Sequence, residues 1–259
     1  MTEDLVLCRL EERREGGRVA HVTFNNPAQR NAIGTAGKAR FIEVMARLAS
    51  DESLRAVVLT GSGDKSFIGG TDLKQMKDFD LAQARASCLK THQACDAVRM
   101  CPVPVIARIN GFCFGSGMEI AACADMRVAA DHARFGMPEV RFGIPSGMEA
   151  CVLPRLIGWG KAVELVLTGD HIDAAEAHRI GFLQKLVPAA ELDDAVESWL
   201  ASLLACGPTA VRIQKRLVQD WERMAITDAA RAGMQAYVDA FGSDEPKRMM
   251  TAFLNRPRR

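Results

Sequence analysis

Two glutamates, Glu119 and Glu139, each follow a glycine or proline turn signal and have apolar neighbours instead of partners of opposite charge. Glu119 comes directly after the segment 115–118 and opens an apolar run, so a helix beginning there would carry it half-buried in its first turn. Burial disfavours the ionised carboxylate and raises its pKa, which suits proton transfer near neutral pH. A first-turn glutamate can also serve only the helix dipole, and a glutamate after proline can be a surface residue. The two glutamates therefore indicate a catalytic role only in combination with the loops around them.

Two glycine-containing loops, residues 66–74 and 110–119, are each expected to join the end of a strand to a helix. The N–H groups in the first turn of a helix lack partners and lie at its positive end, so such junctions bind anions. Two loops together could direct two N–H donors at one oxygen, as in an oxyanion hole, where losing one donor costs about 3–4 kcal/mol. Taken singly, each loop is equally consistent with a simple turn.

Nucleotide-binding loops fit these residues poorly. The loop at 110–119 lacks the third glycine of a dinucleotide fingerprint and lies in mid-chain without the expected first βαβ unit. The chain also has no glycine-lysine-serine/threonine sequence, so a Walker loop is not expected.

Hydrophobic periodicity predicts a repeated alternation of strand and helix, followed by helices alone. Strands are expected at 5–10, 19–24, 55–60, 103–109, 126–130, 134–135 and 183–187, and helices at 38–48, 81–100, 117–124 and within 149–168. After residue 188 the pattern predicts only helices, at 192–204, 211–218, 227–241 and 246–254. We therefore expect an α/β body with a helical appendage that either covers the active site or packs on a neighbouring subunit.

Composition describes a globular protein of 259 residues that can bury a large core. Its 33 basic and 32 acidic residues nearly balance, so no nucleic-acid partner is expected. Only the end, 256–259, is locally basic, either as a solvated terminus or as a contact for a phosphate-bearing ligand. The longest apolar region, 103–124, is interrupted by polar residues and glycines, so no membrane span is expected.

Cysteine and histidine spacing bears on compartment and metal binding. The eight cysteines contain no C-x-x-C pair and several lie in apolar patterns, which favours reduced thiols and a cytoplasmic location. The chain start has the features of neither a signal peptide nor a transit peptide. The five histidines show no metal-ligand spacing, so no metal site is predicted.

Four motifs in order, at 67–74, 110–119, 135–139 and 143–145, resemble those of the crotonase family, also called the enoyl-CoA hydratase/isomerase family. Further matches lie at 25–27, 31–32 and 167–170, and the resemblance runs from about residue 5 to the last helix. It implies an α/β fold: a crotonase-like spiral of repeated strand-strand-helix units over 1–195, then a C-terminal all-helical trimerisation region over 196–259. It also implies an acyl-CoA thioester substrate, a homotrimer or dimer of trimers, and no cofactor apart from the coenzyme A of the substrate.

The resemblance assigns roles to single residues. The backbone N–H groups of Thr71 and Ser116 would form the oxyanion hole for the thioester carbonyl oxygen. Glu119 would activate water as a general base, and Glu139, as a protonated acid, would deliver a proton to the α-carbon. A substrate- and coenzyme A-binding set would comprise Gly70, Asp72, Leu73, Lys74, Phe253 and Arg256, with the last two at the nucleotide end.

Retention of both glutamates favours hydration, or the reverse dehydration, because adding water requires one group that takes a proton and another that gives one. An acyl-CoA double-bond isomerase or epimerase of the same family is the alternative, since isomerase-type relatives commonly keep one acidic group. An RNA-binding member without catalysis and a purely structural oligomer are the remaining readings, and the balanced charge disfavours the first of these.

Three departures from the hydratase pattern leave the acyl group open. Ser116 stands where hydratases often have glycine, and Thr71 replaces a smaller alanine. Residues 146–150 also differ from the glycine-rich stretch of short-chain hydratases and, by the resemblance, border the acyl pocket. Within them, Glu149 is interpreted as a first-turn helix residue that could alternatively enter the acyl site.

Overall fold

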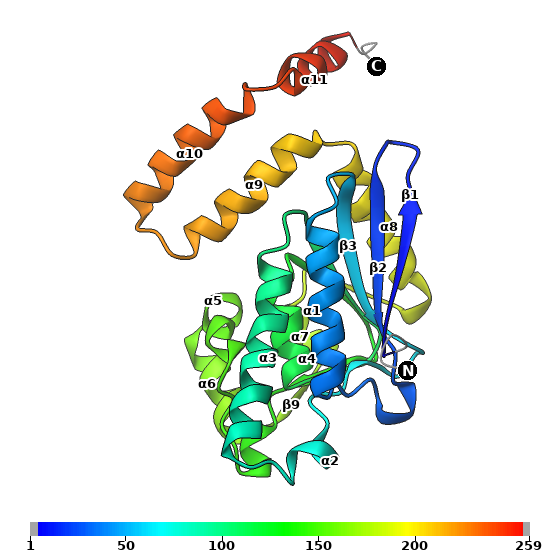
Figure 1. Ribbon diagram of the computed structural model, residues 1–259, viewed down its shortest axis with the longest axis vertical. Helices are drawn as coiled ribbons and strands as arrows, with labels where there is room; N and C mark the ends of the chain where they lie inside the picture. Colours follow the sequence, from blue (N-terminus) through cyan, green and yellow to red (C-terminus); the bar gives the residue numbers. More distant parts are fainter. Residues whose placement is uncertain (1–4, 256–259) are drawn as a thin grey trace.

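A six-stranded sheet forms the centre of the fold (Figure 1), which the computed structural model describes for residues 5–255. Its strand order is β1 (Val6–Glu12), β2 (Arg18–Phe24), β3 (Leu54–Gly61), β5 (Val105–Ile109), β7 (Met126–Ala130) and β10 (Lys185–Val187). β1 and β2 are an antiparallel hairpin, and the other neighbours pair in parallel. The near-continuous apolar runs of β3 and β5 fit strands that are buried on both faces.

A second sheet of four short strands accompanies the first: β4 (Ser66–Ile68), β6 (Phe112–Phe114), β8 (Arg134–Gly136) and β9 (His171–Asp173). β4, β6 and β8 run parallel, and β9 pairs antiparallel with β8. Each of β4, β6 and β8 directly follows β3, β5 or β7 along the chain, so the chain alternates between the two sheets. This alternation confirms the predicted spiral of strand-strand-helix units.

Helices cover both faces of the large sheet. α1 (Thr35–Ala49) and α3 (Leu81–Arg99) lie side by side on one face, and α4 (Ser116–Cys123), all of whose residues are buried, packs beneath α3. On the other face, α8 (Leu192–Leu204) buries Val196 and Leu200 against the sheet. The predicted boundary between 195 and 196 falls within α8, whose residues on both sides of it face the sheet.

The remaining elements are short. They are η2 (Pro27–Gln29), α2 (Leu73–Met76), η3 (Glu139–Phe142), η4 (Glu149–Val152), α5 (Leu153–Ile157), α6 (Trp159–Thr168), α7 (Ala174–Arg179) and η5 (Ala189–Glu191). Within residues 5–255, no helix has both the length and the apolar character needed to cross a bilayer.

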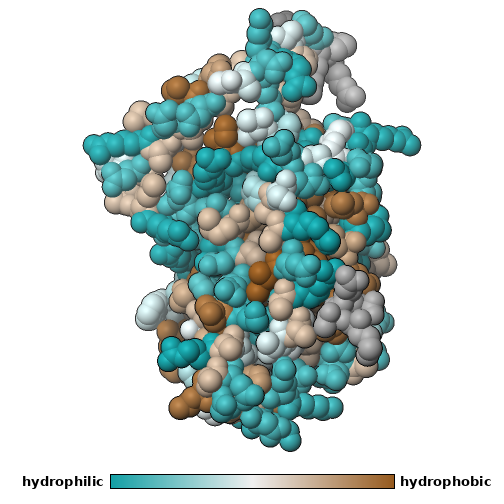
Figure 2. Space-filling view, viewed as in Figure 1, coloured by the Kyte–Doolittle hydropathy of each residue, from teal (hydrophilic) through white to brown (hydrophobic). Residues whose placement is uncertain are grey.

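Three C-terminal helices, α9 (Pro208–Trp221), α10 (Ile226–Ala240) and α11 (Glu245–Leu254), form an arm that projects from the spiral (Figure 1). The carboxylate of Glu245 accepts hydrogen bonds from the N–H groups of Thr209 and Ala210, which ties the start of α11 to the start of α9. The arm leaves large apolar side chains exposed, including Ile226, Tyr237 and Phe253, and Figure 2 shows apolar surface over it. The arm lies at the opposite end of the molecule from α2, so it does not cover that end of its own chain.

Candidate active site

The structure brings together the two residues predicted to supply N–H donors. Thr71 lies between β4 and α2, where it forms an isolated parallel bridge with Ile33, and Ser116 is the first residue of α4. The Thr71 hydroxyl donates to Ser116 Oγ at 3.2 Å. Among residues 5–255, no group accepts a hydrogen bond from the N–H of either residue. Two unpaired main-chain donors therefore lie on adjoining loops, where an anionic oxygen could bind.

Glycines allow these loops to approach. A Cβ on Gly117 would overlap the carbonyl oxygen of Ile68, so α4 can pack closely on β4 only without a side chain there. Gly115, with φ of +52°, faces Glu139 Oε1, which would overlap a Cβ at that position. The glycines of the loop at 110–119 thus bring the α4 terminus next to Glu139.

Glu119 is buried in the first turn of α4, with 1% of its surface exposed. Its Oε1 accepts a hydrogen bond from the Ala150 N–H at 3.1 Å, and its Oε2 has no hydrogen-bond partner in the described part of the chain. Burial, followed by the negative charge of Glu139, raises the pKa of Glu119 to about 7, although the Ala150 N–H opposes the shift. A carboxyl with this pKa can take up and release a proton near neutrality.

Glu139 begins η3 and is partly buried. Burial raises its pKa, while the Ser146 hydroxyl, which donates to Oε2 at 2.7 Å, opposes that shift by stabilising the ionised form. Glu119 and Glu139 therefore form an interacting pair whose proton-binding equilibria are linked. Ser146 was not predicted as a partner of Glu139, because the two belong to one irregular segment without a periodic pattern.

A buried lysine, Lys38 on α1, also lies at this site. It is 1% exposed, and its Nζ lies 3.3 Å from Thr71 Oγ1 and 3.4 Å from Ser87 Oγ. Burial lowers the pKa of Lys38 to about 8, and the charge of Glu119 is the largest opposing influence. Lys38 was not predicted as a site residue, although it lies three residues before Phe41 on the apolar face of α1. A lysine on such a face was the available signal.

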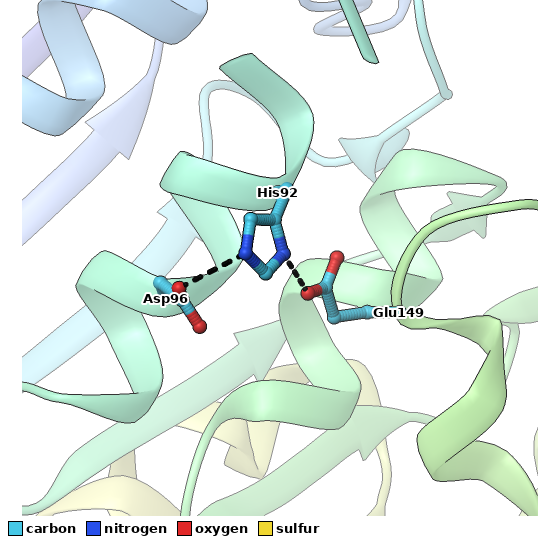
Figure 3. A group of neighbouring side chains, drawn as sticks. All are labelled: His92, Asp96 and Glu149. Carbon is cyan, nitrogen blue, oxygen red and sulfur yellow. Dashed lines mark hydrogen bonds and ion pairs between the residues drawn. The ribbon is translucent and has the colours of Figure 1, made fainter. Parts of the chain in front are cut away.

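His92, Asp96 and Glu149 form a polar cluster beside the site (Figure 3). His92 Nδ1 lies 2.6 Å from Glu149 Oε1, and its Nε2 lies 3.2 Å from Asp96 Oδ2. Arg99 adds a cation, 3.0 Å from Asp96 and 3.8 Å from Glu149. The imidazole and the two carboxylates are close enough to bind a metal ion. However, both imidazole nitrogens already contact carboxylate oxygens, and the Arg99 guanidinium already balances the negative charge of the carboxylates. We interpret the cluster as an ion-pair network that fixes Glu149, and hence the adjoining Ala150 N–H that binds Glu119.

Glu149 fits both sequence-based interpretations in part. It is the first residue of η4, as the first-turn interpretation requires, but its side chain is only 3% exposed. Its Oε2 lacks a hydrogen-bond partner within 5–255, and its charge adds to the effects that raise the pKa of Glu119.

A cavity of about 870 Å³ lies beside the polar cluster and has His92 in its lining. It lies between α3 and residues 147–148, directly before Glu149, and is lined mainly by apolar side chains together with Arg85 and His92. Another cavity, of about 520 Å³, lies between α9 and the spiral, and none of the predicted site residues within 5–255 lines either cavity. The first cavity is the nearer of the two to Glu149, because His92 in its lining contacts Glu149 and residues 147–148 directly precede it.

The predicted coenzyme A residues are only partly brought together within one chain. Gly70, Asp72, Leu73 and Lys74 lie where β4 leads into α2. The Asp72 carboxylate caps α2 by accepting from the N–H groups of Lys74 and Gln75, which gives it a structural role. Phe253 lies on α11, at the end of the molecule opposite α2 (Figure 1). Arg256 lies outside the described residues.

Comparisons with known proteins match this fold and order of motifs. Residues 14–258 match the family described as enoyl-CoA hydratase/isomerase. The chain is 34% identical to a short-chain-enoyl-CoA hydratase of Clostridium acetobutylicum, over 93% of this chain and 92% of that protein. It is likewise 34% identical to a crotonyl-CoA hydratase of Syntrophomonas wolfei, over 92% of each chain. The crystal structure of an enoyl-CoA hydratase of Mycobacterium smegmatis superposes with a TM-score of 0.91 at 29% identity, covering 97% of this chain and 98% of that one.

The spiral of paired strands with its helical arm places the protein in the crotonase fold class. Within that class, the chain belongs to the enoyl-CoA hydratase/isomerase family.

Proposed function

We propose that this protein is an enoyl-CoA hydratase, which adds water across the 2,3-double bond of an acyl-CoA thioester or removes it. The similarity to two hydratases at 34% identity supports this assignment. The observation that carries it is the pairing of two carboxyl groups of raised pKa with two unpaired N–H donors on adjoining loops.

In the proposed reaction, the N–H groups of Thr71 and Ser116 bind the thioester carbonyl oxygen. They polarise the conjugated system, so that the β-carbon becomes electrophilic, and they stabilise the negative charge that develops on the oxygen. Donors held in place before the reaction lower the barrier because they need no reorganisation at the transition state.

Two proton transfers complete the addition. Ionised Glu119 takes a proton from water as the water oxygen bonds to the β-carbon, and the π electrons move toward the carbonyl oxygen to form the enolate. Protonated Glu139 then gives its proton to the α-carbon as the carbonyl reforms. The overall change adds one water, leaves Glu119 protonated and Glu139 ionised, and resets when a proton passes from one to the other. Because two nearby carboxyls do not both ionise easily, the pair can hold one proton near neutral pH.

We expect the acyl chain to enter the cavity between α3 and residues 147–148, and the coenzyme A to follow Gly70, Leu73 and Lys74. Phe253, on the arm, could approach coenzyme A only from a neighbouring subunit, and Arg256 follows it closely in sequence. The exposed apolar side chains of the arm support assembly into a homotrimer or dimer of trimers. We expect a cytoplasmic enzyme that needs no cofactor beyond the coenzyme A of its substrate.

The test is the loss of enoyl-thioester ultraviolet absorbance with a panel of enoyl-CoA substrates that differ in length, branching and polarity. A hydratase should turn over at least one of them and lose most activity in both E119Q and E139Q. If the wild type binds thioesters but hydrates none, the assignment is wrong. A double-bond shift without water addition, lost mainly in one of the two variants, would instead identify the isomerase or epimerase alternative.

A further inference from the structure

We propose that Lys38 is a positioning residue of this site, which orders the Thr71 and Ser116 hydroxyl groups and holds a positive charge beside the thioester oxygen to stabilise the enolate. This inference rests on the proposed function, because it assumes that the thioester oxygen binds at the N–H groups of Thr71 and Ser116. Three connected observations carry it: an ammonium group without a partner anion, a directed chain of hydroxyls, and an unpaired hydroxyl hydrogen at its end.

The ammonium group of Lys38 is buried without an anionic partner. Its side chain is 1% exposed, and its two hydrogen-bond acceptors are the neutral hydroxyls of Thr71 and Ser87. None of the carboxylates in residues 5–255 lies within 4.0 Å of its Nζ. An unpaired buried charge is costly, so a lysine here is disfavoured by the fold alone. An anionic oxygen on the substrate would provide the missing opposite charge.

The hydroxyl chain has a fixed direction as long as Lys38 is charged. An ammonium group can only donate, so Thr71 Oγ1 accepts from Lys38 and donates its own hydrogen to Ser116 Oγ. The hydroxyl hydrogen of Ser116 then remains, and no acceptor for it is present in the described structure. The α4 terminus thereby offers an O–H donor in addition to the two N–H donors.

Lys38 lies on the buried face of α1, and the hydroxyls of Thr71 and Ser116 connect it to the two loops. The sequence departs from the family pattern at Thr71 and Ser116, and those two side chains form the connection to Lys38. Both departures therefore lie on one hydrogen-bonded path that begins at Lys38, and one shared role explains them. A structural role for Lys38 alone does not explain why the chain of hydrogen-bonded hydroxyl groups extends to Ser116.

The titratable groups around Lys38 come from two elements. Glu119 on α4 and the thiols of Cys88 and Cys95 on α3 face it, and the largest of these influences is Glu119, which raises the pKa of Lys38 against the effect of burial. The pKa of about 8 leaves the ammonium mostly charged at neutral pH. For Glu119 itself, burial and the charge of Glu139 raise the pKa.

The experiment uses acetoacetyl-CoA, a 3-ketoacyl thioester that has no 2,3-double bond to hydrate and whose enolate has its own ultraviolet absorbance. The midpoint pH for enolate formation of the bound ligand is measured in the wild type, K38M, T71V and the double variant. We expect K38M and T71V each to raise the midpoint by about one unit, a roughly tenfold loss of enolate stabilisation, less than the ~100-fold effect of removing a direct donor. The double variant should lose no more than either single variant.

K90M is the matched control, since Lys90 is also on this side of the molecule, on α3, but has no contact with Thr71 or Ser116. It should enolise acetoacetyl-CoA like the wild type. K38M removes an unpaired buried charge, so its thermal midpoint should equal or exceed that of the wild type; T71V provides the test if K38M does not fold.

Several results would overturn the inference: an unchanged enolisation midpoint in K38M, additive effects of K38M and T71V, or a loss of ligand affinity without a change in the midpoint. The readout is separate from the proposed function. If the wild type forms the enolate and K38M weakens it, but no enoyl-CoA is hydrated, then the role of Lys38 survives and the hydratase assignment fails.

Discussion

Replacing Gly115 by alanine should displace the Glu139 carboxyl group from its reactive position, although Glu139 itself is not substituted. Gly115 has φ of +52° and ψ of −122°, a conformation that residues with a side chain rarely adopt, so alanine there costs about 1–3 kcal/mol. Its Cβ would also lie closer than 3.0 Å to Glu139 Oε1. The carboxylate must then move by roughly 1 Å to reach ordinary van der Waals separation.

A displacement of that size predicts a large loss of rate. A reacting group misplaced by about 1 Å costs on the order of 100-fold in rate. We therefore expect G115A to lower kcat about 100-fold in the enoyl-CoA hydration assay, with KM changed much less, because the N–H groups that bind the thioester remain. Urea unfolding should show a loss of about 1–3 kcal/mol.

Two comparisons distinguish displacement of Glu139 from a general loss of folding. G160A is the matched control, since a Cβ at Gly160, in the first turn of α6, meets no atom within 4 Å; it should keep full activity. In addition, G115A combined with E139Q should be no slower than E139Q alone if the loss acts through Glu139. Retention of more than a third of the wild-type kcat by G115A would refute the geometric reasoning, and additive losses would place the damage elsewhere, for example at the Ser116 N–H.

Four further predictions concern titration and stability. S146A removes the hydrogen bond that favours ionised Glu139, so the pKa of Glu139 should rise further and the corresponding limb of the pH–rate profile should move to higher pH; a limb that stays in place contradicts this. Since burial raises the pKa of Glu119 to about 7, hydration should decline as the pH falls through 7. The same shift means that ionised Glu119 destabilises the fold as the pH rises from about 4.5 to 7, so E119Q should be more stable at pH 8 by up to about 3 kcal/mol; equal urea midpoints would argue against it. For Glu245, burial opposes ionisation, but the Ala210 and Thr209 N–H groups outweigh it and lower the pKa. Its stabilisation is thus present above the unfolded pKa and is lost as the pH falls through the folded one; E245Q should cost about 1 kcal/mol at pH 7 and nothing at pH 3.

Much of the larger sheet and of the helices could be predicted because their patterns are long. The expected helix at 192–204 has the bounds of α8, and the expected hairpin and the strands at 55–60 and 126–130 match β1, β2, β3 and β7 closely. Long apolar periodicity is sufficient for such elements.

The second sheet could not be predicted from periodicity, apart from β8. β4, β6 and β9 have three residues each, too few for an alternating pattern to emerge, and β4 and β6 lie inside segments that read as glycine loops. Their pairing depends on tertiary contacts, among them the close approach of α4 to Ile68 that Gly117 allows.

The site residues likewise divide into those with a local sequence signal and those whose placement depends on tertiary contacts. Glu119 could be recognised from its position after a glycine turn, because first-turn placement is a local property. The contacts of Lys38 with Thr71 and Ser87 join α1, the loop after β4 and α3, so sequence separations of 33 and 49 residues hid them. Likewise, the N–H that binds Glu119 comes from Ala150, 31 residues away.

The alternation of the chain between two sheets places the proposed catalytic groups apart from the proposed acyl cavity. The N–H donors and Glu119 sit at the ends of short strands or in the buried helix α4, where almost any substitution disturbs the core. The wall of the cavity comes instead from the outer surface of α3 and from residues 147–148, which are exposed or half-buried. Under the proposed function, substitutions at Arg85, Cys88 and Leu89 should therefore change which acyl groups are accepted, while the arrangement around Glu119 stays the same.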